Sequence, residues 1–239
     1  MTPLNQNCTD CPVKDCFIQK GCNKEWLNIL SDRKTMVTFD KGKEIIHEGN
    51  PVFGIYFIYS GKVKVTSTGF NDKRQIVRFT KEGDILGHRG YGGEIYPINA
   101  EAMERSEVCF IDNETVHEAF MENVHFTFNL MMYYSKELRN TEARMKYLAQ
   151  MTVREKVVEA LLYIGKVYGE DEGKRGLRLD IERREVGEFA GVNADQVSRV
   201  LSILKEEDTL TTDAKKLFIK SPSALYSEIS EFLPLNSEF

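Results

Sequence analysis

The spacing of apolar residues changes character near residue 113. From about residue 35 to 112, short alternating or apolar runs such as GIYFIYSGKVKVTS are separated by glycines. Short strands joined by Gly-bearing turns at near-regular spacing favour a small antiparallel barrel or roll. From about residue 113 to 168 the spacing becomes helical, and proline is absent between Pro97 and Pro222. The sequence therefore predicts an α+β fold in which an N-terminal antiparallel β-roll is followed by helices.

The bulk composition is that of an ordinary globular protein, with 29% charged and 41% hydrophobic residues among 239. No run of 18 apolar residues is present, and the N-terminus lacks the apolar segment of a signal peptide. We therefore expect a cytoplasmic protein with no membrane partner. The net charge of −5 argues against general binding of polyanions.

A narrow apolar seam follows the helical stretch with 3,4 spacing over about three heptads. The spacing alone also fits a helix packed on its own domain. The highly charged flanks, KELRNTEARMK, favour a two-helix dimer interface instead. The expected interface residues are Met131, Tyr134, Leu138, Thr141, Met145 and Leu148.

The pattern of residues 180–205 predicts two short helices joined by a tight turn at Gly191, which is the helix-turn-helix arrangement. Ala194, Val197, Val200, Leu201 and Leu204 would line the inner face of the second helix. Its outer face near the N-terminal end, the end that enters the major groove in such motifs, carries polar side chains that suit base and phosphate contacts. The candidate DNA-binding residues there are Asp195, Gln196, Ser198 and Arg199.

A hairpin is expected directly after this motif, because DTLTTDAKKLFIK resembles two short strands around a polar turn. Such a hairpin would be the wing of a winged helix. Residues 150–239 contain 13 basic and 17 acidic residues, which is unusual for a DNA-binding domain. The cations that could still form one positive face are Arg178, Arg183, Arg184, Arg199, Lys215, Lys216 and Lys220. Four of them are added to the candidate DNA-binding residues: Arg183, Arg184, Lys215 and Lys216.

These motifs together resemble the Crp/Fnr family of bacterial transcription regulators over nearly the whole chain. The matching segments include KGKEIIHEGNP, GIYFIYSGKVKV, GDILGHRG and GVNADQVSRVLSILKEE. The resemblance implies a homodimer that binds a palindromic double-stranded DNA operator, contacts RNA polymerase, and responds to an effector through a β-roll of the cyclic-nucleotide-binding kind. The implied parts are an arm at 1–24, the roll at 25–120, a dimerisation helix at 121–149 and a winged helix-turn-helix at 150–239.

The five cysteines are the strongest clue to the effector. Four lie in the first 22 residues, in CTDCPVKDC and at Cys22, and the fifth is Cys109. Clustered cysteines in a reducing compartment indicate metal ligands or redox groups. The resemblance to the oxygen-sensing Fnr branch implies a [4Fe–4S] cluster held by Cys8, Cys11, Cys16 and Cys109, with Cys22 as an alternative to Cys16. The second gap, Cys11-x4-Cys16, is one residue shorter than in those sensors, and Asp195 stands where they have Glu.

Other interpretations of the cysteines stay open. The four arm cysteines could bind zinc in a small knuckle, which would leave Cys109 as a buried thiol. Alternatively, the cysteines are thiols that respond directly to oxidation, or they have no such role. With a zinc-binding or thiol-redox arm, the chain would be a regulator of the same fold that senses another small ligand. In the cyclic-nucleotide branch of the family, an acidic residue binds the ribose and an Arg beside a small hydroxyl residue binds the cyclic phosphate. Glu94 is present here, but no Arg-Ser or Arg-Thr pair lies where the phosphate would sit, and neither Arg89 nor Arg105 fits the pattern, so cyclic AMP is not expected. Haem is not favoured by the scattered histidines His47, His88, His117 and His125.

The alternative class is a thiol redox or electron-transfer protein. No CxxC lies at an expected strand-to-helix turn, and no catalytic triad, Walker or dinucleotide motif is present. We therefore do not expect an enzyme.

Overall fold

The structure is a computed structural model that describes residues 7–213 and 216–232, apart from the side chain of Lys174. The chain divides into two compact units, of which the first ends at Glu137 and the second begins at Leu138. Over the described ranges, no helix is both long enough and apolar enough to cross a membrane.

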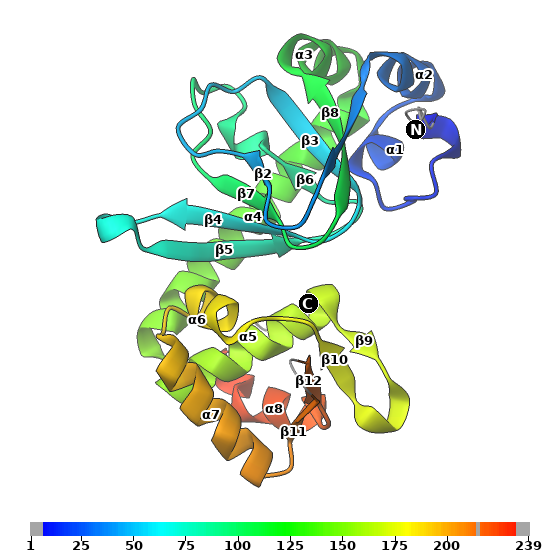
Figure 1. Cartoon of the computed structure of the whole chain (residues 1–239). Helices are drawn as coiled ribbons and strands as arrows, with labels where there is room; N and C mark the ends of the chain where they lie inside the picture. Colours follow the sequence, from blue (N-terminus) through cyan, green and yellow to red (C-terminus); the bar gives the residue numbers. More distant parts are fainter. Residues whose placement is uncertain (1–6, 214–215, 233–239) are drawn as a thin grey trace. The chain divides into compact units, whose positions relative to one another are not determined.

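The first unit is a β-roll made of two four-stranded antiparallel sheets (Figure 1). One sheet has the strand order β1-β8-β3-β6 and the other has the order β2-β7-β4-β5. The predicted fold class is confirmed. The strands are β1 (Thr35–Phe39), β2 (Glu44–Ile46), β3 (Gly54–Ser60), β4 (Val63–Thr68), β5 (Arg74–Thr80), β6 (Ile85–Leu86), β7 (Asn99–Ala102) and β8 (Ser106–Asp112).

Glycine is required at the turn between β3 and β4. Gly61 has a φ of +99°, and a Cβ added there would lie 2.3 Å from the Ser106 hydroxyl oxygen. Only glycine adopts this conformation without strain and also leaves room for Ser106. The prediction that glycines punctuate the strands is therefore confirmed at this turn by both backbone angle and space.

Helices precede and follow the strands of the roll, and side chains cap the N-termini of α2 and α3. The Asn23 side chain accepts a hydrogen bond from the Trp26 N–H (2.9 Å), and Asp112 accepts one from the Thr115 N–H (2.9 Å). In EWLNILS, residues 25–31, the spacing of Trp26, Ile29 and Leu30 predicts a short helix, and α2 confirms it. The helices are α1 (Phe17–Gly21), α2 (Lys24–Arg33), α3 (Asn113–Glu122) and α4 (Val124–Gln150).

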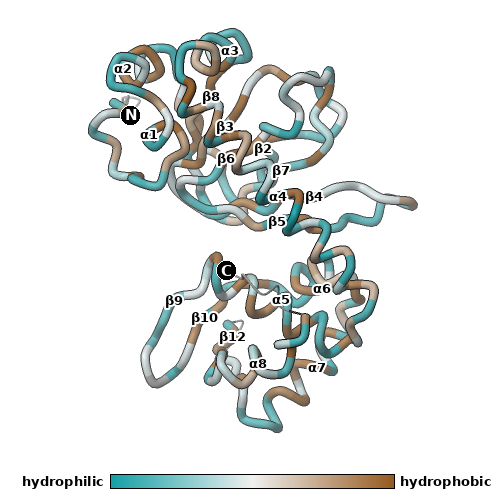
Figure 2. Tube along the Cα trace, turned by 180° about the vertical axis from the view of Figure 1, so that it is seen from behind, coloured by the Kyte–Doolittle hydropathy of each residue, from teal (hydrophilic) through white to brown (hydrophobic). Residues whose placement is uncertain are grey.

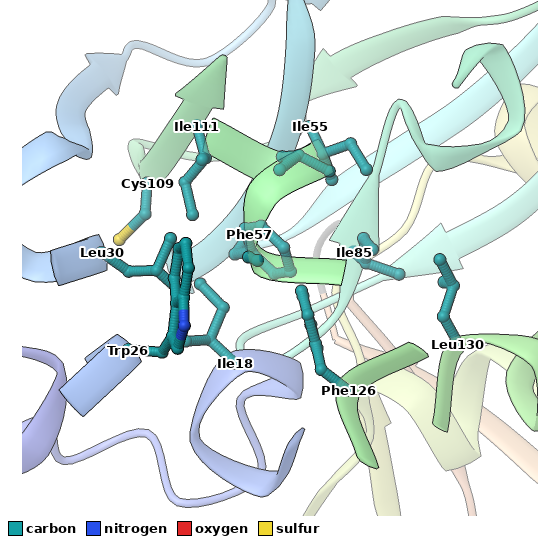
Figure 3. Close-up of a cluster of buried hydrophobic side chains, with 12 residues drawn as sticks. Ile18, Trp26, Leu30, Ile55, Phe57, Ile85, Cys109, Ile111, Phe126 and Leu130 are labelled. Carbon is teal, nitrogen blue, oxygen red and sulfur yellow. The ribbon is translucent and has the colours of Figure 1, made fainter. Parts of the chain in front are cut away.

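The core beside the β1-β8-β3-β6 sheet joins the sheet to these helices. Phe57 of β3, Trp26 of α2 and Phe126 of α4 are all buried in it (Figure 3). Cys109 of β8 belongs to the same cluster, and Figure 3 shows its sulfur directed toward Leu30 of α2. The roll cysteine is therefore already in contact with the helix that follows the cysteine arm.

The β4–β5 hairpin ends in a short 3-10 turn, Phe70–Asp72, where Asn71 and Asp72 both have positive φ. Phe70 is 96% exposed, and Figure 2 shows a hydrophobic tip at the end of this hairpin. Phe70 thus lies outside both buried clusters of the roll.

A buried carboxylate attaches α4 to the roll. The Glu137 carboxylate accepts hydrogen bonds from Arg78 Nη1 of β5 (2.6 Å) and from His88 Nε2 (3.1 Å), and Arg89 Nη2 lies 3.3 Å away. The Glu137 side chain is only 15% exposed. Burial alone would raise its pKa, but the hydrogen bond from His88 and the charges of Arg78 and Arg89 lower the pKa to about 2.

The second unit contains helices and a four-stranded antiparallel sheet with the order β11-β12-β10-β9. A Thr at 152 with a Glu three residues later predicts a capping box, and the structure confirms it, because Thr152 and Glu155 cap each other's backbone N–H groups. The elements are α5 (Val153–Tyr168), β9 (Glu170–Asp171), β10 (Leu177–Leu179), α6 (Arg183–Ala190), α7 (Ala194–Glu206), β11 (Leu210–Asp213), β12 (Lys216–Ile219) and α8 (Pro222–Glu228).

Two local patterns predict less regular structure than the chain has. The Gly- and charge-rich sequence GEDEGKRG predicts a loop at 169–176, but this segment includes β9, which pairs with β10 to form a hairpin. Gly176 permits the turn, because its φ is +88° and a Cβ would lie 2.2 Å from the Ile219 carbonyl oxygen. The arm at 1–24 has no apolar periodicity, yet its described part contains a 3-10 turn (Cys8–Asp10) and α1.

We predict that Glu137→Gln removes a pH-dependent part of the stability of the first unit. The folded-state pKa lies below the ordinary value of a glutamate, so the carboxylate stabilises the fold at neutral pH and this contribution is lost as the pH falls toward 2. We expect a loss of about 3 kcal/mol in the free energy of unfolding at pH 7. Urea titrations across pH 2 to 7 measure it.

The difference between wild type and variant should shrink as the pH falls from about 5 to about 2. Glu118→Gln is the matched control, because Glu118 forms a half-exposed ion pair with Arg33. If the difference in unfolding free energy between the wild type and Glu137→Gln does not change with pH, the role given to the charged Glu137 carboxylate is wrong.

Candidate functional site

The turn between α6 and α7 is fixed by two glycines. Gly191 ends α6 in the left-handed region, with a φ of 70°. A Cβ at Gly187 would lie 2.7 Å from the Val192 carbonyl oxygen, so the turn after α6 can approach position 187 this closely only when that residue is glycine. The sequence prediction that Gly191 closes α6 is confirmed, whereas the need for Gly187 was missed.

The N-terminus of α7 is held by a capping box that sequence reasoning also missed. Asn193 Oδ1 accepts from the Gln196 N–H (2.9 Å), and Gln196 Oε1 accepts from the Asn193 N–H (3.1 Å). An Asn three residues before Gln was the available signal. The Gln196 side-chain oxygen is therefore engaged in capping, and pairing with adenine through both amide atoms would require the cap to open.

The outer face of α7 carries the other residues that the sequence proposes for DNA contact. Asp195 and Arg199 are exposed, and the half-buried Ser198 donates a hydrogen bond to the Ala194 carbonyl oxygen (2.9 Å). The inner face is buried as predicted at Val197, Val200, Leu201 and Leu204, whereas Ala194 is exposed rather than buried.

Carboxylates neutralise part of the expected positive face. Arg178 contacts Glu170, Glu172 and Asp180, Arg184 lies 2.7 Å from Glu188, and Lys220 pairs with Asp208. Within the described ranges, no ion pair involves Arg183, Arg199 or Lys216, and all three are exposed. Lys215 lies outside the described residues. The positive charge near α7 is therefore concentrated on few side chains.

The predicted wing is present as the antiparallel pair β11 and β12, and residues 214 and 215 lie outside the described residues. Arg175 supports it from the β9–β10 hairpin. Its guanidinium carbon lies 4.5 Å from the centre of the Phe218 ring, and its Nη2 lies 2.7 Å from Asp213.

The arm places its cysteines in ordered positions around the first unit. The Cys8 N–H donates to Ser31 Oγ of α2 (2.8 Å), and Gln19 Nε2 of α1 donates to the carbonyl oxygens of Cys8 (2.6 Å) and Cys11 (3.1 Å). Cys16 and Cys22 are the residues that flank α1 at its two ends. Cys8, Cys11 and Cys109 are buried, and all five thiols are free.

The thiols of the arm and the roll influence one another electrostatically. Burial, with a smaller effect of charge at Cys16, Cys8 and Cys11, raises the pKa of Cys109 to about 12, although Lys34 opposes the rise. Burial, with a smaller effect of charge at Cys8 and Cys16, likewise raises the pKa of Cys22 to about 12. Thiols in such a setting stay protonated until a metal displaces the proton.

A buried lysine lies among these thiols. Lys34 is 7% exposed, and its Nζ donates a hydrogen bond to Cys8 Sγ (3.3 Å). Because the same ammonium lowers the pKa of Cys109, it reaches both the arm and the roll. Sequence reasoning missed Lys34, since nothing in the pattern separates it from the other charged residues near α2.

The donor chemistry of these residues suits a thiolate-bound iron–sulfur group. No three His, Cys, Asp or Glu side chains among residues 7–213 and 216–232 are close enough together to hold a metal ion. The described sulfurs thus share a neighbourhood without forming a closed coordination sphere.

The arm helix α1 is in direct contact with α4. Phe17 forms edge contacts with Phe126 (ring centres 5.8 Å apart) and Tyr133 (5.7 Å). A Cβ at Gly21 would lie 2.8 Å from the Phe126 Cα, so only glycine fits there. A displacement of α1 would therefore alter the packing at the start of α4.

The seam predicted on α4 is partly exposed. Met131 (55%), Leu138 (61%) and Met145 (69%) are open to solvent, and Thr141 is exposed as well. Leu148 is half-buried, and Tyr134 packs on the roll cluster, with its hydroxyl bonded to the His88 carbonyl oxygen. Val124 (77%) and Phe128 (53%) extend the exposed apolar face toward the helix N-terminus, which sequence reasoning missed.

Comparisons with known proteins match both units. A sequence model of the cyclic nucleotide-binding domain matches residues 36–123, and one of the Crp-like helix-turn-helix domain matches residues 155–228. The transcriptional activator protein Anr of Pseudomonas protegens is 24% identical over 221 residues, which cover 92% of this chain and 91% of that protein.

The anaerobic regulatory protein of Pasteurella multocida is 24% identical over 224 residues, covering 92% of this chain and 81% of that protein. Among solved structures, FixK2 from Bradyrhizobium japonicum has a TM-score of 0.71 and 25% identity, and the match covers 81% of this chain and 96% of that chain.

A β-roll, a long helix and a winged helix-turn-helix in this order define a DNA-binding transcription regulator. The chain belongs to the Crp/Fnr family of transcriptional regulators.

We predict that Arg199→Met reduces discrimination between specific and non-specific DNA by about tenfold or more. Arg199 is the exposed cation on the outer face of α7, and one lost base contact costs about 1–3 kcal/mol. The measurement is the ratio of affinities for a duplex selected from random sequence by the wild type and for a scrambled duplex. Lys205→Met, in the last turn of the same helix, should leave the ratio near the wild-type value. Equal effects of the two substitutions would contradict the role of Arg199.

Proposed function

We propose that this protein is an oxygen- or redox-responsive transcription regulator, and that its signal is a [4Fe–4S] cluster held by Cys8, Cys11, Cys16 and Cys109. The observation that carries the proposal is that Cys109 lies within electrostatic reach of Cys8, Cys11 and Cys16, where Cys8, Cys11 and Cys109 are buried and Cys16 is half-buried. Relatives named for activation or anaerobic regulation, Anr and the anaerobic regulatory protein, support it at 24% identity.

The charge relations favour Cys16 over Cys22 as the third arm ligand. Cys109 is influenced by Cys16, Cys8 and Cys11, whereas the neighbouring thiols that act on Cys22 are Cys8 and Cys16. Four thiolates are the usual ligands of a [4Fe–4S] cluster. A ligand set that includes both Cys109 and the arm would attach the arm to β8.

Lys34 places a cation among these thiols. Its buried ammonium donates a hydrogen bond to the Cys8 sulfur and lowers the pKa of Cys109. A cation this close to both sulfurs favours their charged, thiolate form, which is the form that binds a metal centre.

Cyclic AMP is not the proposed effector, although residues 36–123 match the cyclic nucleotide-binding domain model. A cyclic phosphate requires an available cation in the roll. Arg89 and Arg78 already contact the Glu137 carboxylate, which occupies the place of an anionic partner. We interpret the match as one of fold.

The contacts of α1 suggest how the signal reaches DNA. Loss of the cluster would free Cys16, the residue just before α1, and so loosen α1 from Phe126 at the start of α4. The exposed apolar face of α4 would join two copies of the chain. The homodimer would then bind a palindromic operator, one α7 helix in each half-site, and contact RNA polymerase.

We predict that Cys109→Ser and Cys16→Ser lose most of the iron after anaerobic reconstitution with ferrous iron and sulfide, whereas Cys22→Ser retains it. The reason is that a missing thiolate opens the cluster to water and loss of iron. Iron and acid-labile sulfide per chain are the measurements, with near four of each expected for the wild type.

The opposite pattern identifies the zinc knuckle. If Cys22→Ser loses bound metal while Cys109→Ser retains it, and the metal is zinc, the cluster proposal is wrong. A wild type that holds no metal would also overturn the proposal and leave a direct thiol switch.

We predict that Leu138→Glu weakens dimerisation at least about tenfold, because a carboxylate would have to be buried in an apolar interface. Leu138 is 61% exposed in the single chain. Asn140→Glu is the matched control, since it adds the same charge at an exposed position on the opposite side of α4. Sedimentation equilibrium measures both. Equal effects would place the interface elsewhere.

A further inference from the structure

The guanidinium of Arg144 on α4 reaches the end of the first helix of the helix-turn-helix. Arg144 Nη2 donates a hydrogen bond to the Phe189 carbonyl oxygen (2.7 Å), and Phe189 lies in the last turn of α6. All of these residues belong to the unit that begins at Leu138. The contact therefore joins the long helix to the DNA-reading motif within one compact unit.

The C-terminal end of a helix is where such a donor has most effect. The last carbonyl groups of a helix lack intrahelical donors, and the helix dipole places partial negative charge there. A guanidinium at this position satisfies a carbonyl and complements the dipole. Arg144 thus caps α6 two residues before Gly191, where the chain turns toward α7.

The Phe189 ring is held by the same side chain. The Arg144 guanidinium carbon lies 3.7 Å from the ring centre, and Tyr163 of α5 stacks against the ring (centres 4.7 Å apart, planes at 26°). Phe189 is 1% exposed. Arg144 therefore contacts both the carbonyl oxygen and the ring of Phe189, and these contacts restrict movement of the end of α6.

Glu159 of α5 holds the guanidinium in place. Its Oε1 lies 3.5 Å from Arg144 Nε, and the Glu159 side chain is 15% exposed. Burial raises the pKa of Glu159, and the positive charge of Arg144 opposes that rise. Arg144 therefore has two separable roles, pairing a buried carboxylate and capping α6.

We propose that Arg144 is a positioning residue for DNA recognition, through which α4 fixes the end of α6 and hence the turn that presents α7. This inference rests on the DNA-binding function of the family and on the contacts of Arg144, and it does not depend on the cluster. No residue of α4 needs to touch DNA for it to hold.

The test compares Arg144→Met, Glu159→Gln, the double variant and Arg144→Lys in the full-length chain. The probes are the duplex selected by the wild type from random sequence and a scrambled duplex of equal length. We expect Arg144→Met to lose about tenfold in affinity for the selected duplex and little for the scrambled one, the size expected for one charged hydrogen bond. Arg144→Lys, which keeps the charge without the planar fork, should fall between.

The double variant separates positioning from simple destabilisation. With Glu159→Gln no carboxylate is left unpaired, so thermal stability should recover toward the wild type while the affinity for the selected duplex stays low. Glu159→Gln alone should bind both duplexes nearly as the wild type does. Recovery of specific binding in the double variant, or equal losses for both duplexes, would overturn the proposal.

Discussion

The packing of α1 against α4 links the cysteine arm to the long helix. Gly21 lies so close to Phe126 that no side chain fits between them, and Phe17 covers Phe126 and Tyr133. Cys16 and Cys22 flank this short helix. The arm and α4 are thus in direct contact, and under the proposed function a change at the arm thiols would reach α4 by this route.

Buried charged groups recur among the contacts of α4 and of the arm. A charged group removed from water is stable only with a close partner. Glu137 has Arg78, His88 and Arg89, and Arg144 has Glu159. Lys34 donates a hydrogen bond to the Cys8 sulfur. Each of these groups fixes one element to another more specifically than apolar packing alone.

Much of the fold followed from patterns that the sequence displays openly. Glycines at turns such as Gly61, the capping box at Thr152 and the apolar spacing of Val197, Val200 and Leu204 are local signals, and the structure confirms them. Strand-like spacing of apolar residues followed by helical spacing predicted the roll, and the helix-turn-helix and hairpin motifs predicted the winged helix. These features depend on residues close together in the chain, which is why they could be predicted.

The candidate sites were less predictable, because they depend on contacts between distant segments. The 3,4 spacing on α4 included Tyr134, yet this residue packs on the roll, since helical spacing alone does not separate two neighbouring faces of one helix. Gln196 remains a predicted DNA contact, but sequence reasoning missed that its side-chain oxygen also caps α7. Lys34, Glu137 and Arg144 carry no local signal, and their partners are known only from the fold.

The most direct test of the central claim follows one anaerobic sample as air is admitted. Visible absorbance and affinity for the selected duplex would be recorded on the same protein over time. The account predicts that the iron–sulfur absorbance and the DNA affinity change with the same time course, and that both stay constant without oxygen. Absorbance that bleaches while the affinity is unchanged, or protein without iron whose affinity still responds to air, would contradict it.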